Sequence, residues 1–386
     1  MATRPQMIGV SPLLPLIQED LAISHSVAGL LATIPLIGMG LFALAGPGVA
    51  QLFGTRLGMT ICLVVLALFG ILRAIAPDAL LVLAATIPIG VGIGVAGALL
   101  PIAVKERFSH RPAFATGMYA NGYQAGVAIP AALVAPLAIW LGGINGSPGW
   151  RESLLAISVA SLAFAVLWHL LTRGNPSAAP RMAASRPKWP LRDRVAWLLV
   201  LSFALRAGVF QALLAWLPAI YVERGWSITA AGFLPMAITV GGMPATYVVS
   251  RLADQRGSRR LYMGWASTML VVVVLSHVVF PWIGFIGAFL SGICLATLFT
   301  IALTLPLDLA ERPEDVGALA SMMLAGGFGV SAVAPFLLGA ARDLTGDFTG
   351  SLLVLAVLCL LLVFVTFVMS PERLAAARAA AAPKAG

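Results

Sequence analysis

Arg206 is the first residue whose position suggests chemistry. It stands inside the apolar stretch 195–221, which is long enough to cross a bilayer because about 20 apolar residues suffice. A charge at that depth costs about 2.5–3.5 kcal/mol on insertion scales, and arginine keeps its proton even there. Such an arginine usually faces a wet cavity or a partner, so we expect Arg206 to mark a ligand site. The alternative is that it only pins helices through backbone carbonyls.

Arg4 and Gln211 are further candidates for contact with a ligand. Arg4 stands in the first apolar run, which ends near Ile17. Two guanidinium groups in one cavity would favour an anionic or strongly polar substrate, which they could hold bidentately. Gln211 lies five residues after Arg206, about 140° around an ideal helix. It therefore shares the face of Arg206 only if the helix is locally deformed.

Four more polar side chains fall within the apolar run 113–141. Tyr119 and Tyr123 are four residues apart and share one helix face, whereas Asn121 and Gln124 are three apart and share another. Polar groups at membrane depth must find partners. These side chains therefore either join helices by hydrogen bonds or line a cavity for a solute.

Some kinds of chemistry find no support in the sequence. The acidic residues fall in loops or at the ends of apolar runs, which disfavours a proton antiport carried by a membrane carboxylate. There is no His/Asp/Glu cluster, metal-ligand spacing or nucleophile constellation, so we expect no enzyme activity, metal or cofactor. Cys62, Cys294 and Cys359 lie far apart inside apolar runs and are interpreted as packing residues.

The composition predicts an all-α membrane protein. Of 386 residues 60% are hydrophobic and 10% charged, whereas soluble domains carry about 25% charge. The apolar runs are continuous rather than alternating, which favours helices over a barrel. The net charge of +9 does not indicate nucleic-acid binding, because the basic residues cluster in short loops.

Twelve spans are expected from the apolar runs. They cover residues up to 17, 26–53, 58–76, 79–104, 113–141, 151–171, 195–221, 228–252, 261–280, 282–306, 316–341 and 348–370.

The loop charges predict the orientation. Of the 24 Lys and Arg residues, 18 fall in the tail or in loops after even-numbered spans. Four are counted in loops after odd-numbered spans, namely Arg73, Arg151, Arg224 and Arg342. Cytoplasmic loops are the basic ones, so both termini are expected in the cytoplasm.

The two halves of the chain resemble each other. A shift of 203 residues superposes Ala28-Gly29 on Ala231-Gly232, Gly38 on Gly241, Gly54 on Gly257 and Arg56 on Arg259. Parallel repeats of this kind build transporters that rock two bundles around a site at the midplane. We expect two six-helix bundles, residues 1–171 and 195–370, joined by a cytoplasmic linker, 172–194, and followed by a cytoplasmic tail, 371–386.

The segment RLADQRGSRR at 251–260 resembles the cytoplasmic signature G-x-L-A-D-R-x-G-R-R of the major facilitator superfamily, although its opening glycine is missing. The resemblance implies a gating latch formed by Asp254, Arg256, Arg259 and Arg260. The alternative is an ordinary basic loop. In the first-half copy Gln51 stands where the acid is expected.

Within that family the chain resembles the cyanate/nitroimidazole transporter branch over essentially its whole length. The resemblance rests on RP at 4–5, GVSPLLP at 9–15, GVGIG at 90–94, and LAWLP at 214–218 followed by Tyr221. It implies that Arg4 and Arg206 line a central cavity on equivalent helices. It also implies transport of small anions or small heteroaromatic compounds.

The first helix is short. Residues 4–17 make about 20 Å of helix, less than the bilayer core of about 30 Å. Either residues upstream of Met1 complete this helix, or Arg4 reaches the membrane surface.

These observations favour a monomeric secondary active transporter in a bacterial inner membrane. It would move a small polar or anionic solute, cyanate-like or a small organic anion, by alternating access. The rival within transport is efflux of small heteroaromatic compounds such as nitroimidazoles. A membrane enzyme and a receptor that transports nothing are the remaining alternatives.

Overall fold

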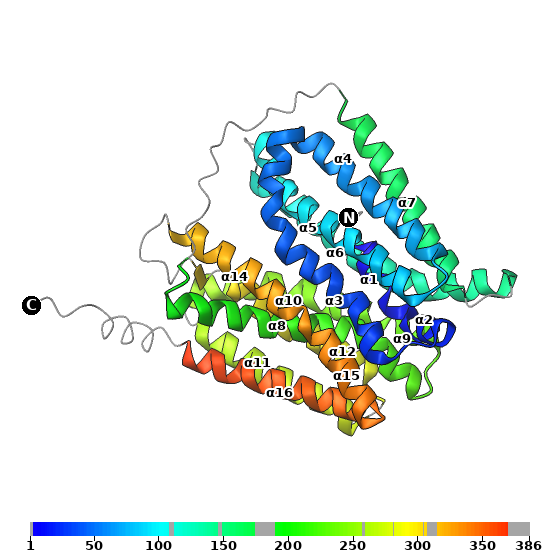
Figure 1. Ribbon diagram of the computed structural model, residues 1–386. Coiled ribbons are helices and arrows are strands. Elements are labelled where there is room, and N and C mark those ends of the chain that lie inside the picture. The colour runs from blue at the N-terminus through cyan, green and yellow to red at the C-terminus, as the bar shows by residue number, and fades with distance from the viewer. Residues whose placement is uncertain are drawn as a thin grey trace, which may run out of the picture.

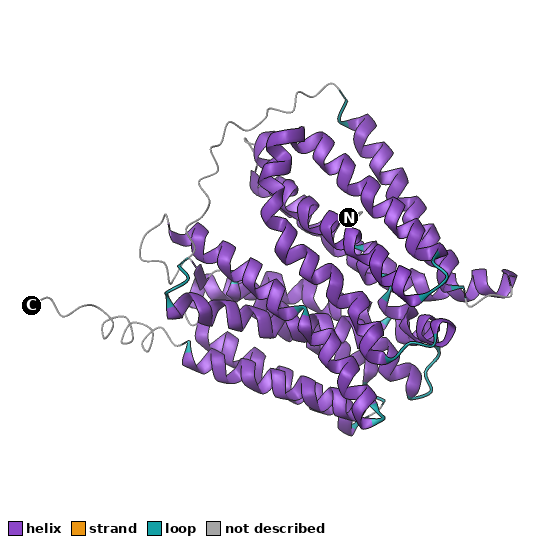
Figure 2. Ribbon diagram, viewed as in Figure 1, coloured by secondary structure: helices purple, strands orange, loops and turns teal. Residues whose placement is uncertain are grey.

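The described part of the chain consists of helices joined by loops and turns, without strands (Figure 2). The computed structural model describes residues 3–107, 112–145, 149–173, 190–256, 259–280, 282–303, 305–306 and 315–369. At some of these only the backbone is described, among them 104–107, 112–121, 123–125, 250–256, 259–260 and 315–318.

The helices of the first half are α1 (Pro5–Ile8), the 3-10 turn η1 (Ser11–Leu13), α2 (Leu14–Leu21), α3 (His25–Phe42), the 3-10 turn η2 (Ala43–Ala45), α4 (Gly46–Ile75), α5 (Ala79–Arg107), α6 (Pro112–Asn145) and α7 (Trp150–Leu171). Those of the second half are α8 (Arg194–Glu223), α9 (Ile228–Gly232), α10 (Leu234–Arg256), α11 (Arg259–Val279), α12 (Gly284–Ala302), α14 (Asp315–Ser331), α15 (Val333–Thr345) and α16 (Phe348–Val368).

These helices account for the expected spans. In the described residues 10 helices are long and apolar enough to cross a membrane, and Gly126–Gly142 within α6 is a shorter apolar stretch. The first span departs from the expectation, because it is not one helix ending near Ile17 but three short pieces ending at Leu21. Pro12 and Pro15 lack the N–H that a continuous helix would need there, which explains the interruption.

Gly54 separates the second and third spans. It adopts φ 72° and ψ 163° inside α4, a left-handed backbone region that essentially only glycine tolerates. The chain therefore runs helically up to Phe53, turns at Gly54 and continues as the next span to Ile75. The break falls between the two expected spans, 26–53 and 58–76.

The repeat seen in the sequence recurs in the packing. A Cβ on Gly38 in α3 would lie 2.5 Å from the backbone of Gly90 in α5, and one on Gly241 in α10 would collide with the carbonyl oxygen of Phe289 in α12. Each half thus presses its second and fourth spans together through glycine. Such contacts let the backbones of membrane helices approach closely.

The two halves meet at the end of the molecule that holds the α2–α3 and α15–α16 turns, here called the closed end. Asp343 of α15 accepts hydrogen bonds from the backbone N–H of His25 (2.9 Å) and Ser26 (2.7 Å), and from the Ser26 hydroxyl (2.5 Å). The Nδ1 of His25 is 3.0 Å from the same carboxylate. Asp343 thereby caps the N-terminus of α3 from the other half, and we call this contact the latch.

The latch is anchored to its own half by the preceding residue. Arg342 donates through Nε (3.1 Å) and Nη2 (2.9 Å) to the same oxygen, Oε2, of Glu223 at the end of α8, and such charge-assisted hydrogen bonds are stronger than neutral ones. Asp347, close by, caps α16 within the same half by accepting from the N–H of Thr349. Asp343 and Asp347 thus each cap the start of one helix, α3 in the other half and α16 in their own.

Contacts between the halves continue along α3 as far as Gly40. A Cβ on Gly29 would lie 2.9 Å from the carbonyl oxygen of Pro335, and one on Gly40 would lie 3.2 Å from the nitrogen of Gly329. Towards the opposite end, here called the linker end, the ribbons of the two halves diverge (Figure 1). The exact limits of the two bundles and the linker remain the sequence prediction.

Gly292→Ala should destabilise the protein, because the new Cβ would collide with the backbone carbonyl of Ile238. Overpacking of this kind costs about 1–3 kcal/mol. Gly264→Ala is the control, since a Cβ there meets nothing within 4 Å and removing a helical glycine is favourable by roughly 0.5–1 kcal/mol. The melting temperatures of the purified variants report the difference, and equal melting temperatures would contradict the packing described.

Asp343→Ala should loosen the closed end, because loss of a helix cap costs about 0.5–2 kcal/mol. Spin labels at Glu19→Cys and Leu344→Cys, on exposed positions of opposite halves, report the distance across this end by electron resonance. We expect the longer-distance population to grow about two- to thirtyfold, as that free energy implies. Asp347→Ala, which removes a cap within one half, should leave the distance unchanged. An unchanged distribution in Asp343→Ala would exclude the latch.

Candidate functional site

Arg206 lies on α8 in an aromatic environment. Its residue surface is 6% exposed. The guanidinium carbon is 4.9 Å from the ring centroid of Phe203, one turn earlier on α8, and 4.6 Å from that of Phe299 on α12. Both distances are typical of cation–π contacts, which strengthen when water is excluded.

The two rings lie on adjacent sides of the guanidinium. Their centroids are 6.1 Å apart, much less than the separation expected if the group were sandwiched between them. A third ring, Phe328 of α14, meets Phe203 edge-on at 5.1 Å. The surroundings of Arg206 thus combine a permanent positive charge with a group of aromatic faces from three helices.

Arg4 also lies inside the protein, at the start of α1. It is 6% exposed, and its Nη1 approaches the sulfur atoms of Met7 (3.7 Å) and of Met39 on α3 (3.6 Å). The described contacts of Arg4 and those of Arg206 have no residue in common. The expectation that Arg4 might extend to the membrane surface does not fit this burial.

Gln211 and Trp216 lie further along α8. Gln211 is 6% exposed and stands about 7.5 Å beyond Arg206 by helix rise, so the two are at different depths. Trp216 is fully buried, and its Nε1 donates to the carbonyl oxygen of Pro335 at 2.7 Å. Trp216 therefore serves packing.

The other predicted site residues are not placed in detail. Tyr119, Asn121, Tyr123 and Gln124 belong to α6, which packs against α1 and α10, but their side chains fall outside the described part. The side chains of the predicted cytoplasmic gating group also fall outside the described part. Asp254 and Arg256 end α10, and Arg259 and Arg260 begin α11.

Arg73 corrects the count of loop charges. The sequence reading placed it in a loop, but the structure buries it within the last turn of α4, 1% exposed. Its Nη2 donates to the backbone oxygen (2.8 Å) and to the side-chain Oε1 (2.9 Å) of Gln6 on α1. The position of Arg73 close to the end of its apolar run made a loop arginine the simpler interpretation.

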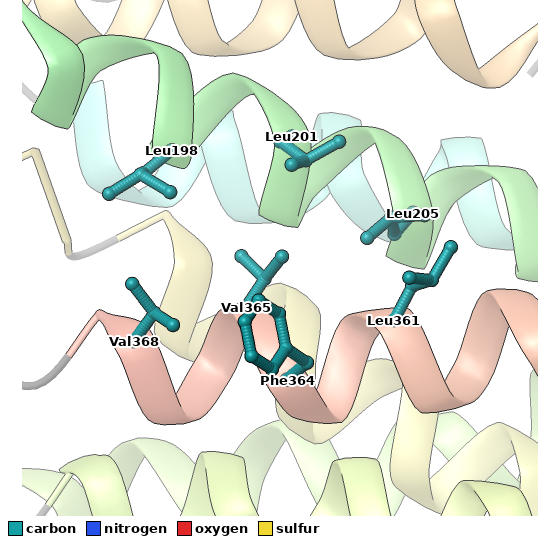
Figure 3. A pocket seen from close by; sticks show the side chains of 7 residues that line it. All are labelled: Leu198, Leu201, Leu205, Leu361, Phe364, Val365 and Val368. Carbon is teal, nitrogen blue, oxygen red and sulfur yellow. The ribbon is translucent and has the colours of Figure 1, made fainter.

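A surface depression between α8 and α16 is apolar. It is lined by Leu198, Leu201, Leu205, Leu361, Phe364, Val365 and Val368 (Figure 3). Because all seven side chains are apolar, this groove offers no group that could hold an anion, and it is not the candidate site.

Groups that could bind a metal are not gathered in the described residues, where no three His, Cys, Asp or Glu side chains come together. The three cysteines are free and buried, as packing residues would be. What the described side chains around Arg206 supply is a positive charge and aromatic surface.

Comparison with known proteins agrees with this architecture. The model of the Major Facilitator Superfamily matches residues 5–286. The cyanate transport protein CynX of Escherichia coli (strain K12) is 28% identical over 349 residues, covering 89% of this chain and 88% of that protein. The 2-nitroimidazole transporter of the same organism is 28% identical over 366 residues, covering 93% and 90%.

A solved structure shares the fold. A bacterial homologue of the human lysosomal transporter Spinster, in an inward-facing and occupied conformation, matches with a TM-score of 0.75 at 14% identity, covering 95% of this chain and 94% of that one. The predicted all-helical fold of two six-helix bundles is confirmed. Because the family model matches well over half of the chain, this protein belongs to the major facilitator superfamily.

Proposed function

We propose that this membrane transporter is a secondary active carrier of a small polar or anionic solute and works by alternating access. The solute class would be cyanate-like or a small organic anion. Its place would be the inner membrane, with both termini in the cytoplasm and the protein acting as a monomer. Arg4, Arg206 and Gln211, with the polar residues of α6, would contribute to the binding site.

The observation that carries this proposal is the burial of Arg206. The guanidinium lies against the faces of Phe203 and Phe299. Aromatic faces stabilise a cation without neutralising its charge. A guanidinium held at this depth would attract an anion strongly in the low-dielectric surroundings.

Alternating access needs the halves to separate at one end while they close at the other. The latch at Asp343 supplies a polar contact between halves, and the contact can break because both its partners are partly exposed. We assign the opposing closure, at the linker end, to the predicted group Asp254, Arg256, Arg259 and Arg260. Inward movement of a monovalent anion against a negative interior would cost about 2.3 kcal/mol per 100 mV, so uptake would require exchange or a coupled ion.

Efflux of a small heteroaromatic compound is the second candidate. The three rings of Phe203, Phe299 and Phe328 favour it, because they offer stacking and edge contacts to a planar ring. The resemblance to a 2-nitroimidazole transporter is as strong in identity as that to the cyanate transport protein. The two candidates differ in whether charge or aromatic surface contributes most to binding.

Arg206→Ala should lower the affinity for cyanate by at least about tenfold, since hydrogen bonds to charged groups contribute about 1.5–3 kcal/mol. Binding to purified protein and uptake into proteoliposomes measure the effect. Arg194→Ala is the control, because Arg194 is exposed at the start of the same helix. Cyanate affinity equal to wild type in Arg206→Ala would show that Arg206 has a structural role only.

Phe299→Leu separates the two candidate functions, with cyanate and 2-nitroimidazole as probes. If an anion is the solute, the variant should weaken cyanate binding by less than Arg206→Ala does, because a cation–π contact contributes only about 0.5–2 kcal/mol and the charge itself remains. If a heteroaromatic compound is the solute, 2-nitroimidazole binding should fall further in Phe299→Leu than in Arg206→Ala. That second pattern would replace the anion proposal by its rival.

A further inference from the structure

The burial of Arg73 has an unfavourable free energy that needs an explanation. It is buried inside the first half, and its Nε and Nη1 have no hydrogen-bond partner among the described atoms. Leaving donors of a buried charge unsatisfied costs several kcal/mol, and an apolar side chain of similar volume would often be more stable. Packing alone does not explain an arginine at this position.

The hydrogen bonds of Arg73 converge on one residue of the interrupted first span. Through Nη2 it donates to both the backbone oxygen and the Oε1 of Gln6. The Nε2 of Gln6 in turn donates to Ser158 (3.0 Å) and Ser161 (3.4 Å) on α7. Gln6 is 0% exposed, so helices α4 and α7 together satisfy both ends of its side-chain amide.

The hydrogen bonds of Arg73 also compensate for the interruption of the first span after α1. The last backbone bond of α1 runs from the N–H of Gly9 to the oxygen of Pro5. The oxygen of Gln6 lies just beyond this bond and accepts from Arg73 instead. A buried carbonyl without a partner would be costly, and Arg73 supplies the missing donor.

Gly70 makes room for this arrangement. It lies one turn before Arg73 on α4, and a Cβ there would lie 2.5 Å from the Nε2 of Gln6 and would collide with the hydroxyl of Ser158. One face of α4 thus provides both the space for the Gln6 side chain and the donor that holds it.

The rotation of α1 follows from this contact. Arg4 and Gln6 are two residues apart, about 200° around a helix, so they lie on nearly opposite sides of α1. While Gln6 is held against α4 and α7, Arg4 is directed to α3, where it meets Met39. A turn of α1 that released Gln6 would also move the guanidinium of Arg4.

We propose that Arg73 is a positioning residue, which holds Gln6 and so fixes the orientation of α1 that places Arg4 at α3. The consequence for solute binding rests on the proposed function, in which Arg4 contributes to the site. The clamp itself is a property of the fold and can be tested without a solute. Its expected signature is a loosening of α1 that is much larger than any change in global stability.

Hydrogen–deuterium exchange of the amides of residues 7–10 tests the clamp. In Arg73→Met these amides should exchange at least about tenfold faster, because the lost bonds involve a charged donor. The melting temperature should change little, since removing a buried charge with unsatisfied donors offsets the loss of the donor to the oxygens of Gln6. Gln6→Leu should reproduce the faster exchange.

Arg151→Met is the matched control. Arg151 lies in the first turn of α7, at the same end of the same half, and donates to the backbone oxygens of Ala74 and Ala76 and to Asp20, none of which belongs to α1. It should leave exchange at residues 7–10 unchanged. Unchanged exchange in Arg73→Met, or a general rise across the protein in that variant, would overturn the proposal.

Cyanate binding then tests the functional consequence. Arg73→Met and Arg4→Ala should each weaken cyanate affinity, and the double variant should be no weaker than Arg4→Ala alone, because Arg73 acts through Arg4. Additive losses would show that Arg73 does not act through Arg4. If the wild-type protein fails to bind cyanate, the proposed anion function fails while the exchange experiment still decides the clamp.

Discussion

The need to accommodate permanent positive charge among apolar helices governs this structure. Arginine does not become neutral by losing its proton, so each buried guanidinium needs contacts that stabilise its charge. Arg206 has the faces of two phenylalanines, Arg4 has thioether sulfurs, and Arg73 has the oxygens of a glutamine. Each buried guanidinium is thus stabilised by a different kind of contact.

The internal repeat explains how such a chain can hold its halves together and still let them move. Glycines at equivalent places press the second and fourth spans of each half together, where each bundle must be rigid. Between the halves, close approach at Gly29 and Gly40 is joined by the capping interaction at Asp343 and by the ring of His25, which packs against Trp216 and Phe348. Small residues allow helices to approach closely without interlocking side chains. Tight packing within each half is what motion of the halves as rigid bodies requires.

Much of this fold could be predicted from the sequence because lipid forces backbone groups to bond within each helix, so long apolar runs mark spans reliably. The importance of Gly54 and of the repeated glycines could also be predicted, because only glycine fits those places. Arg73 and Asp343 could not. Each stands near the end of an apolar run, where a charge ordinarily faces water, and only the tertiary fold brings Gln6 or the start of α3 against it. The contacts of Arg206 likewise depend on helices distant in sequence.

The pairing of Arg342 with Glu223 links two distant places mechanically. Glu223 ends the helix that carries Arg206, about 25 Å away by helix rise, and Arg342 stands next to Asp343. α8 therefore connects the buried guanidinium near its middle with the latch near its C-terminal end. A tilt of α8 by a few degrees, too small to disturb local packing, displaces that end by an ångström or more. That is enough to strain a carboxylate cap whose bonds measure 2.5–2.9 Å.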